Sequence, residues 1–178
     1  MKNNISKLKN KLILTFGYGN RKNYDVFLEY LTGLTHKTKE TGFLAGDFAD
    51  EIKISRSETR FLRKSCLNKY QVNFVIDVRM TPRAWSRKWY GNKLQEVCEA
   101  HNVKYISKTA LGNTSGQQKW IPPDREAADI ALGEVAELAE QGTVLLLCAE
   151  MNFNRCHRTD VASHLIKLIS DSQIEHLE

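Results

Sequence analysis

The sequence GTVLLLCAEMNFNRCHR, residues 142–158, joins a run of apolar side chains to a cluster of reactive ones. Residues 143–147 are β-branched or apolar without a polar break, which predicts a strand buried on both faces. Nucleophilic, acidic and basic side chains follow at once, namely Cys148, Glu150, Arg155, Cys156, His157 and Arg158. Apolar residues then recur at helical spacing from Val161 to Ile169. The segment therefore predicts a buried strand, a loop that carries chemistry, and a helix.

The rest of the chain repeats this alternation of strand and helix. Apolar runs predict three further strands, at residues 11–16, 72–78 and 103–106. Helical spacing predicts helices at residues 24–34, 92–101 and 124–139, with Asn23 and Asp124 as N-caps of the first and last. Such alternation is typical of an α/β protein with a mostly parallel, Rossmann-like sheet flanked by helices. The length of 178 residues fits a single domain, residues 1–178.

A segment of about residues 35–70 interrupts the pattern after the first strand and helix. It begins as an irregular polar stretch and continues with Ser55-Arg56-Ser57-Glu58, which has the form of a capping box before a basic helix at 58–69. We expect a helical insert that serves either as a solvated surface or as a binding lid. The final residues 177–178 follow His176, and we expect them to be the remnant of a purification tag.

Composition limits the classes of protein to consider. The formal charge of +5 is compatible with a polyanionic partner such as nucleic acid. No apolar run approaches the ~20 residues of a membrane helix, and the basic N-terminus lacks the apolar stretch of a signal peptide. The four cysteines do not resemble a disulfide framework in a chain of this length and include no CxxC pair. We expect a cytoplasmic protein without a membrane partner and without a cofactor. The sequence does not indicate its oligomeric state.

Polar residues follow all four predicted strands. The carboxyl ends of parallel strands meet at one edge of a sheet, where α/β proteins bind their ligands, so we expect a basic, polar cleft there. The candidate ligand-binding residues are Gly17, Tyr18, Asn20, Arg21, Arg79, Gly112, Arg155 and Arg158. The candidate catalytic residues are Asp77, Cys148, Glu150 and His157.

The residue types in this cleft suggest a phosphate-bearing ligand, either a nucleotide or a nucleic acid. The planar guanidinium groups of Arg79 and Arg158 suit a phosphate, although both residues could also form ordinary ion pairs. Asp77 and Glu150 would orient groups or exchange protons, and His157 is the acid–base candidate if it faces the cleft. The leading hypothesis is a protein that binds and acts on such a ligand, as a hydrolase or a transferase.

Cys148 allows two interpretations. A cysteine after a buried strand is often a small core residue, but nearby arginines and a helix N-terminus would lower its pKa and favour a thiolate nucleophile. Its spacing to Arg155 is C-x6-R, one residue longer than the C-x5-R loop of cysteine phosphatases and their rhodanese-like relatives. Rhodanese-like thiol chemistry at Cys148 is therefore an alternative function.

Two other interpretations concern metal and nucleic acid. Cys148, Cys156 and His157 are suitable zinc ligands by type, but adjacent cysteine and histidine side chains are expected to diverge, so we expect no metal site. The basic and aromatic side chains of residues 83–90, RAWSRKWY, either stack on nucleic-acid bases or anchor a loop to the core. Together with the basic helix of the insert they support a second alternative, a non-enzymatic nucleic-acid-binding module.

Four motifs of the chain together resemble the family of domain of unknown function 488, DUF488. The motifs are TFGYGNR at 15–21, Asp77-Val78-Arg79 with Pro82, Leu111-Gly112, and LCAE at 147–150 with Cys156-His157-Arg158. The resemblance implies a small α/β domain with a polar cleft, and no established activity. It carries over to Gly17, Asp77, Arg79, Gly112, Cys148, Glu150, Cys156, His157 and Arg158.

The chain departs from the family pattern in two places. The first motif commonly carries a histidine where this chain has Tyr18, which argues against a general base at that position. The segment from about Thr35 to Lys69 is longer than the usual link between the first helix and the second strand. It is a candidate for a partner or lid particular to this member.

Overall fold

The computed structural model describes residues 11–19, 23–32 and 70–177. The expected insert of about residues 35–70, with its capping box and basic helix, lies outside the described residues except for Tyr70. The candidate ligand-binding residues Asn20 and Arg21 also lie outside them.

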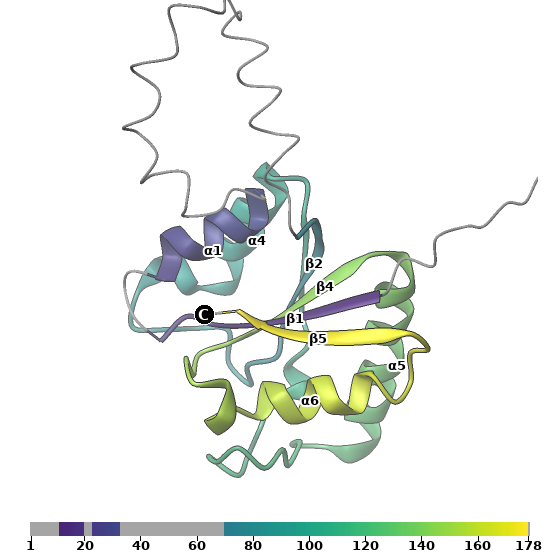
Figure 1. Ribbon diagram of the computed structural model, residues 1–178. Coiled ribbons are helices and arrows are strands. Elements are labelled where there is room, and N and C mark those ends of the chain that lie inside the picture. The colour runs from purple at the N-terminus through teal and green to yellow at the C-terminus, as the bar shows by residue number, and fades with distance from the viewer. Residues whose placement is uncertain (1–10, 20–22, 33–69, 178) are drawn as a thin grey trace, which may run out of the picture.

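The described residues form an α/β fold with a five-stranded, all-parallel sheet (Figure 1). The strands are β1 (Lys11–Gly17), β2 (Val72–Asp77), β3 (Lys104–Ser107), β4 (Thr143–Cys148) and β5 (Ser172–Leu177). The helices are α1 (Asn23–Thr32), α4 (Gly91–Ala100), α5 (Arg125–Gln141) and α6 (His157–Leu165). The strand order is β3-β2-β4-β1-β5. The predicted fold class is confirmed.

Strand β4 occupies the centre of the sheet because its side chains are apolar on both faces. Residues 144–148 are all buried, and β4 pairs with β1 on one side and β2 on the other. The register places Cys148 opposite Gly17 of β1 and Leu147 opposite Asp77 of β2. The end of β4 is therefore flanked directly by the ends of β1 and β2.

Helices cover both faces of the sheet. Leu145 and Leu147 of β4 join the core that includes residues of α1 and α4. Val144 and Leu146 join the opposite core, formed with α5 and α6. Figure 1 shows α1 and α4 on one side of the sheet and α5 and α6 on the other. Cys148 belongs to the core on the side of α5 and α6.

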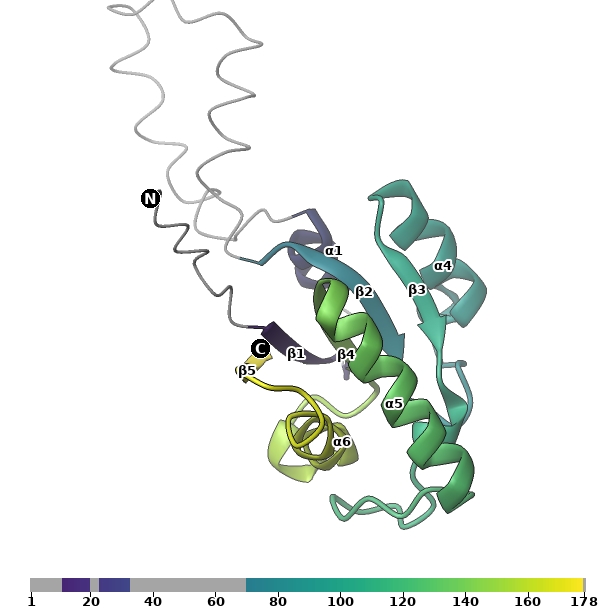
Figure 2. The ribbon, with the colours of Figure 1, turned by 90° about the vertical axis from the view of Figure 1, so that its right-hand side faces the viewer.

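This arrangement creates a crevice at the end of β4. The chain leaves β1 and β2 toward the face covered by α1 and α4, but leaves β4 toward α6 on the opposite face. Strand β4 lies between those two neighbours, while β3 and β5 form the edges of the sheet (Figure 2). A point where neighbouring strands send their connections to opposite faces is where open α/β sheets bind ligands.

Two elements differ from the sequence prediction. Strand β5 was not predicted, because its sequence, SQIEHL, is largely polar and its alternating pattern is weak. It pairs with β1 at the edge of the sheet, and the side chain of Leu177 is buried. Helix α6 spans His157–Leu165 rather than the predicted Val161 to Ile169, because the apolar spacing starts one turn after the first helical residue and continues into the turns that follow the last one.

No helix among the described residues is both long enough and apolar enough to cross a membrane.

The central position of β4 predicts that its side chains contribute strongly to stability. We expect Leu146→Ala to lower the free energy of unfolding by about 2–5 kcal/mol, because Leu146 is fully buried and the change leaves a cavity. Urea denaturation followed by circular dichroism measures the change. Ile130→Ala is the control, since Ile130 lies on α5 with 60% of its surface exposed and should change stability by less than ~0.5 kcal/mol. Equal effects of the two substitutions would contradict the central position of β4.

Candidate active site

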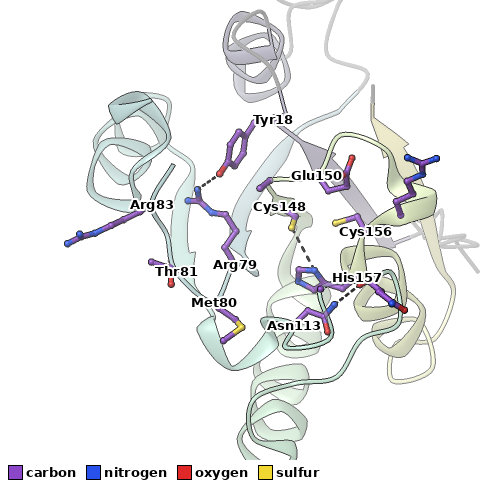
Figure 3. Close-up of a pocket in the computed structure, with 14 residues that line it drawn as sticks. Tyr18, Arg79, Met80, Thr81, Arg83, Asn113, Cys148, Glu150, Cys156 and His157 are labelled. Carbon is purple, nitrogen blue, oxygen red and sulfur yellow. Dashed lines mark hydrogen bonds between the residues drawn. The ribbon is translucent and has the colours of Figure 1, made fainter. Parts of the chain in front are cut away.

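A cleft of about 320 Å³ opens at the carboxyl end of the sheet (Figure 3). Loops that follow four strands contribute to its lining: Tyr18 comes from β1, Arg79 from β2, Asn113 from β3, and Cys148 and His157 from β4 and the start of α6. The structure thus brings polar residues from all four strand ends to one place. Most candidate residues lie in or next to this cleft, but their side chains differ in what they contact.

Cys148 and His157 face each other across the loop between β4 and α6 (Figure 3). The Cys148 Sγ atom lies 3.9 Å from Nδ1 of His157. On the other side of the ring, Nε2 lies 3.1 Å from the carbonyl oxygen of Val78. Because a carbonyl oxygen only accepts hydrogen bonds, Nε2 carries a proton, and Nδ1 is the ring nitrogen that faces the sulfur. The histidine is therefore oriented for proton exchange with Cys148.

The surroundings of Cys148 favour its thiolate. A hydrogen bond from the thiol of Cys156 is the main cause that lowers the pKa of Cys148, to about 7. Burial acts in the opposite direction, while the backbone N–H groups of Glu150 and Ala149 and the charge of Arg158 help to lower the pKa. Cysteines in such electropositive, hydrogen-bonding environments are the reactive ones. The side chain belongs to the core and also lines the cleft, so a nucleophilic role for Cys148 stays a prediction.

Cys156 lies next to this pair. The hydrogen bond to Cys148, together with burial, raises the pKa of Cys156 above its ordinary value, so it stays protonated and donates. The sulfur atoms of Cys148 and Cys156 and a ring nitrogen of His157 all lie within 4.8 Å of one another. The expectation that the adjacent side chains of Cys156 and His157 diverge is therefore wrong. Cys156 is the N-cap of α6 in extended conformation and His157 is its first helical residue, so the backbone turns between them.

Asp77 and Arg79 form a buried ion pair in the wall of the cleft. The guanidinium group donates from Nε to Asp77 Oδ1 at 2.7 Å, from Nη2 to Asp77 Oδ2, and from Nη1 to Tyr18 Oη and the carbonyl oxygen of Trp89, both at 3.0 Å. These contacts engage four of its five N–H groups. Tyr105 donates to Asp77 Oδ2 at 2.6 Å. Arg79 thus reaches the cleft with most of its hydrogen-bonding capacity already used.

The same network holds Tyr18 in place, and its surroundings raise the pKa values of Arg79 and Tyr18. Burial opposes the charge on Arg79, but the hydrogen bonds and the charge of Asp77 raise its pKa above the ordinary value. Burial raises the pKa of Tyr18 as well, so its hydroxyl stays protonated. The Tyr18 ring stacks on Trp89 with 4.4 Å between ring centroids. Tyr18 therefore supports Arg79 and closes one side of the cleft.

Arg158 lies behind the loop and does not line the cleft. Its side chain is fully buried, and Nη1 and Nη2 donate to the carbonyl oxygens of Glu150 and Met151. Among the described residues its Nε has no hydrogen-bond partner. In this position Arg158 holds the loop in shape and places a positive charge near Cys148, which differs from the anion clamp expected from the sequence.

The two candidate glycines allow close packing around the loop. A Cβ atom on Gly17 would overlap the carbonyl oxygen of Glu150, and one on Gly112 would overlap the side chain of Met80. The Gly112 carbonyl also accepts a hydrogen bond of 2.9 Å from Nε1 of Trp120. Both glycines therefore shape the walls of the cleft rather than contact its interior.

Glu150 and Arg155 lie at the rim of the cleft. Both side chains are exposed and both residues line the cleft. Glu150 Oε1 accepts a hydrogen bond of 3.0 Å from the backbone N–H of Asn152, and Figure 3 shows its carboxylate directed away from Cys148. Both side chains can meet a ligand that enters the cleft, whereas only the backbone N–H of Glu150 faces the Cys148 sulfur.

The basic and aromatic segment 83–90 divides between core and surface. Trp89 is completely buried against Tyr18 and Phe16, whereas Trp85 is 58% exposed. Arg83 lines the cleft, but its guanidinium group points away from Cys148 (Figure 3). The segment is thus anchored by one tryptophan and presents the other to solvent.

Several residues that line the cleft are not among the candidates predicted from the sequence. They are Met80, Thr81, Arg83, Asn113, Gly116, Gln117, Ala149 and Cys156. Asn113 bonds within its own loop, with Nδ2 2.6 Å from the carbonyl oxygen of Gln117. Its position after the third strand is the feature of the sequence that could have predicted its place in the cleft. Cys156 was named in the sequence only as a zinc-ligand type and a family-motif residue, and Arg83 only within the basic segment 83–90, while the remaining loop residues have no chemical signature that separates them from ordinary turns.

The pKa of Cys148 predicts the pH dependence of its alkylation. We expect the rate with iodoacetamide to reach half its maximum near pH 7, rather than near the ~8.5 of a free thiol, because the thiolate is the reacting species. Peptide mass spectrometry separates Cys148 from the other three cysteines. Cys156→Ala should move the midpoint upward, since it removes the main hydrogen bond to the sulfur.

Cys98→Ala is the matched control for this measurement. Cys98 is fully buried in α4, and burial raises its pKa to about 12, so its removal should leave the profile of Cys148 unchanged. A Cys148 midpoint at or above ~8.5 in the wild-type protein would show that the loop does not stabilise the thiolate.

The buried position of Arg158 predicts that it matters for stability. We expect Arg158→Ala to lower the free energy of unfolding by about 2–4 kcal/mol, because two loop carbonyl groups lose their charge-assisted hydrogen bonds to this buried side chain. Arg155→Ala, in the same loop but exposed, should change it by less than ~0.5 kcal/mol. Denaturant unfolding of the two variants tests the contrast, and a fully stable Arg158→Ala variant would mean that the loop does not need this side chain.

Comparison with known proteins identifies the family. The family model described as "Domain of unknown function DUF488" matches residues 58–165, which is more than half of the chain. The match includes β2, β4 and the loop from Cys148 to Arg158, whereas the first motif at 15–21 lies outside it. No curated protein and no solved structure matches the chain significantly. The resemblance inferred from the motifs is confirmed, and the chain belongs to the DUF488 family.

Proposed function

We propose that this protein is an enzyme that binds a phosphate-bearing small molecule, such as a nucleotide, and acts on it through Cys148 and His157. The observation that supports this most directly is the contact between Cys148 Sγ and His157 Nδ1, 3.9 Å apart, at the end of the central strand. A thiol beside an oriented imidazole is the arrangement of nucleophile and base in covalent catalysis. Both residues line the cleft, so a ligand bound there would reach the sulfur.

The size of the cleft favours a small ligand. Its volume of about 320 Å³ is at the lower end of the range of roughly 300–1,000 Å³ found for small-molecule sites. A mononucleotide or the end of a single strand fits such a space better than a duplex does. We therefore place nucleotides before nucleic acids among the proposed ligands.

The charges around the cleft favour an anion. Arg83 and Arg155 line the cleft from opposite loops, and Glu150 is the carboxylate among the lining residues. Arg79 adds one more cation, but Asp77 neutralises much of its charge. The thiolate of Cys148 is held next to the buried charge of Arg158. In this proposal Arg83 and Arg155 replace Arg79 and Arg158 as the residues that attract the phosphate.

The proposed reaction is a substitution at phosphorus. The Cys148 sulfur attacks, the bond from phosphorus to the leaving oxygen breaks, and that oxygen takes the proton that His157 received from the thiol. Water or another acceptor then gives a proton to His157 as its oxygen displaces the sulfur from phosphorus, so Cys148 leaves as a thiolate beside a protonated His157 and the pair is ready for the next turnover. With water the reaction is a hydrolysis, and with another acceptor it is a transfer.

The alternative functions depend on other parts of the chain. A nucleic-acid-binding module would use the basic helix at 58–69, which lies outside the described residues, and the segment 83–90, of which Trp89 is buried. Rhodanese-like sulfur transfer would use the same Cys148 thiolate with a different substrate. The cytoplasmic location belongs to this proposal as well, because the free thiols of Cys98, Cys148 and Cys156 suit a reducing compartment.

A ligand panel and an activity assay test the proposed function. We expect a mononucleotide or another phosphomonoester to raise the melting temperature of the full chain and to be hydrolysed by it. Cys148→Ser should lower turnover roughly 1,000-fold or more, because the sulfur nucleophile is lost, while binding is retained. Cys98→Ala, which changes a buried thiol far from the cleft, should retain full activity.

Three results would contradict this proposal. Binding limited to oligonucleotides, with affinity that falls steeply with salt and does not depend on Cys148, would favour the nucleic-acid-binding module. Sulfur transfer from thiosulfate to cyanide, without activity on phosphate esters, would favour the rhodanese-like alternative. Hydrolysis that persists in Cys148→Ser would remove the nucleophile from the mechanism.

A further inference from the structure

Three metal-binding side chains converge at the end of β4. The Sγ atoms of Cys148 and Cys156 and a ring nitrogen of His157 lie within 4.8 Å of one another. Zinc bonds of about 2.3 Å to sulfur and 2.0–2.1 Å to nitrogen place tetrahedral ligands roughly 3.5–3.8 Å apart. The 3.9 Å between Cys148 Sγ and His157 Nδ1 is already close to that value. The widest pair would need to approach by about 1 Å, which side-chain rotation can supply.

The orientation of His157 matches that of a metal ligand. Histidine ligands usually donate their second ring N–H to a carboxylate or a backbone carbonyl, which fixes the lone pair of the other nitrogen toward the metal. His157 Nε2 donates to the Val78 carbonyl at 3.1 Å, and Nδ1 faces the sulfur of Cys148. Val78 directly follows β2, whereas Cys148 ends β4 and Cys156 precedes α6, so the carbonyl that orients the ring comes from a different segment than the two sulfur atoms.

We propose that Cys148, Cys156 and His157 bind a soft divalent metal ion of the zinc class, with the fourth coordination position open to the cleft. Thiolate and imidazole ligands favour zinc over magnesium or calcium, which prefer oxygen. All three residues line the cleft, so the remaining position of a tetrahedral ion would face it. Three protein ligands with an open position are typical of catalytic rather than structural zinc sites.

This site goes beyond the proposed function and does not depend on it. A metal ion would occupy the sulfur that acts as the nucleophile in the metal-free protein. Metal binding and alkylation of Cys148 should therefore exclude each other. The two proposals can be tested separately because the metal needs Cys156 as a ligand, whereas the Cys148–His157 contact does not include it.

Cobalt and zinc titrations of the full chain test the metal site. We expect one Zn²⁺ per chain after dialysis, measured by elemental analysis, and a sulfur-to-metal charge-transfer band when Co²⁺ is added to the metal-free protein. Cys156→Ser keeps a hydroxyl donor beside Cys148 but loses a soft ligand, and should weaken binding by more than about 100-fold. His157→Ala is the second ligand variant, and Cys98→Ala is the control that should bind like the wild type.

Protection of Cys148 from iodoacetamide gives the second readout. Zinc should suppress alkylation in the wild type and in Cys98→Ala, but not in Cys156→Ser, whose fold is checked by circular dichroism. Absence of the cobalt band, or equal zinc affinity in all variants, would overturn the metal site. Reactive Cys148 that zinc does not protect would also overturn it and leave the proposed thiol mechanism standing. A metal-bound protein whose hydrolysis of phosphate esters rises with zinc would confirm the site and contradict the nucleophile.

Discussion

The hydrogen bonds from Arg158 to the carbonyl oxygens of Glu150 and Met151 hold the loop on which the whole site depends. This guanidinium group is completely buried, where an isolated charge would be costly. It is tolerated because the backbone carbonyls and the sulfur of Cys148 surround it with negative charge. The loop in turn presents the N–H groups of Ala149 and Glu150 to that sulfur. One buried cation thus fixes the backbone and supports the thiolate together.

The position of the site follows from the topology of the sheet. Strand β4 lies between β1 and β2 but sends its connection to the opposite face, so the space beyond its end stays open. One wall of that space is held by the buried ion pair between Arg79 and Asp77. Tyr18 accepts a further hydrogen bond from Arg79 and supports the pair. The groups left to meet a ligand are therefore those of the loop after β4, together with the exposed cations at the rim.

Much of this fold could be predicted from the sequence, because buried strands have a simple signature. The apolar runs that became β1, β2 and β4 were recognised, and the polar residues at their ends were assigned to one edge. The roles of Arg79 and Arg158 could not be predicted, since a sequence does not show whether a guanidinium group meets a ligand, a carboxylate or a backbone carbonyl. Strand β5 was missed because an edge strand needs few apolar side chains. The start of α6 was missed because His157 and Arg158 lack the apolar spacing that predicts a helix.

The contact between Cys148 and Cys156 links the two proposals for this site, thiol chemistry and metal binding. In the metal-free protein Cys156 keeps its proton, since burial and the neighbouring sulfur raise its pKa, and that proton stabilises the thiolate of Cys148. A zinc ion would take the place of this proton, because it too is a positive charge shared between the two sulfur atoms. Zinc binding would therefore release the proton. The backbone turn between Cys156 and His157 then adds the imidazole as a third ligand. The same geometry that lowers the pKa of Cys148 is therefore the geometry that brings the three metal-binding atoms together.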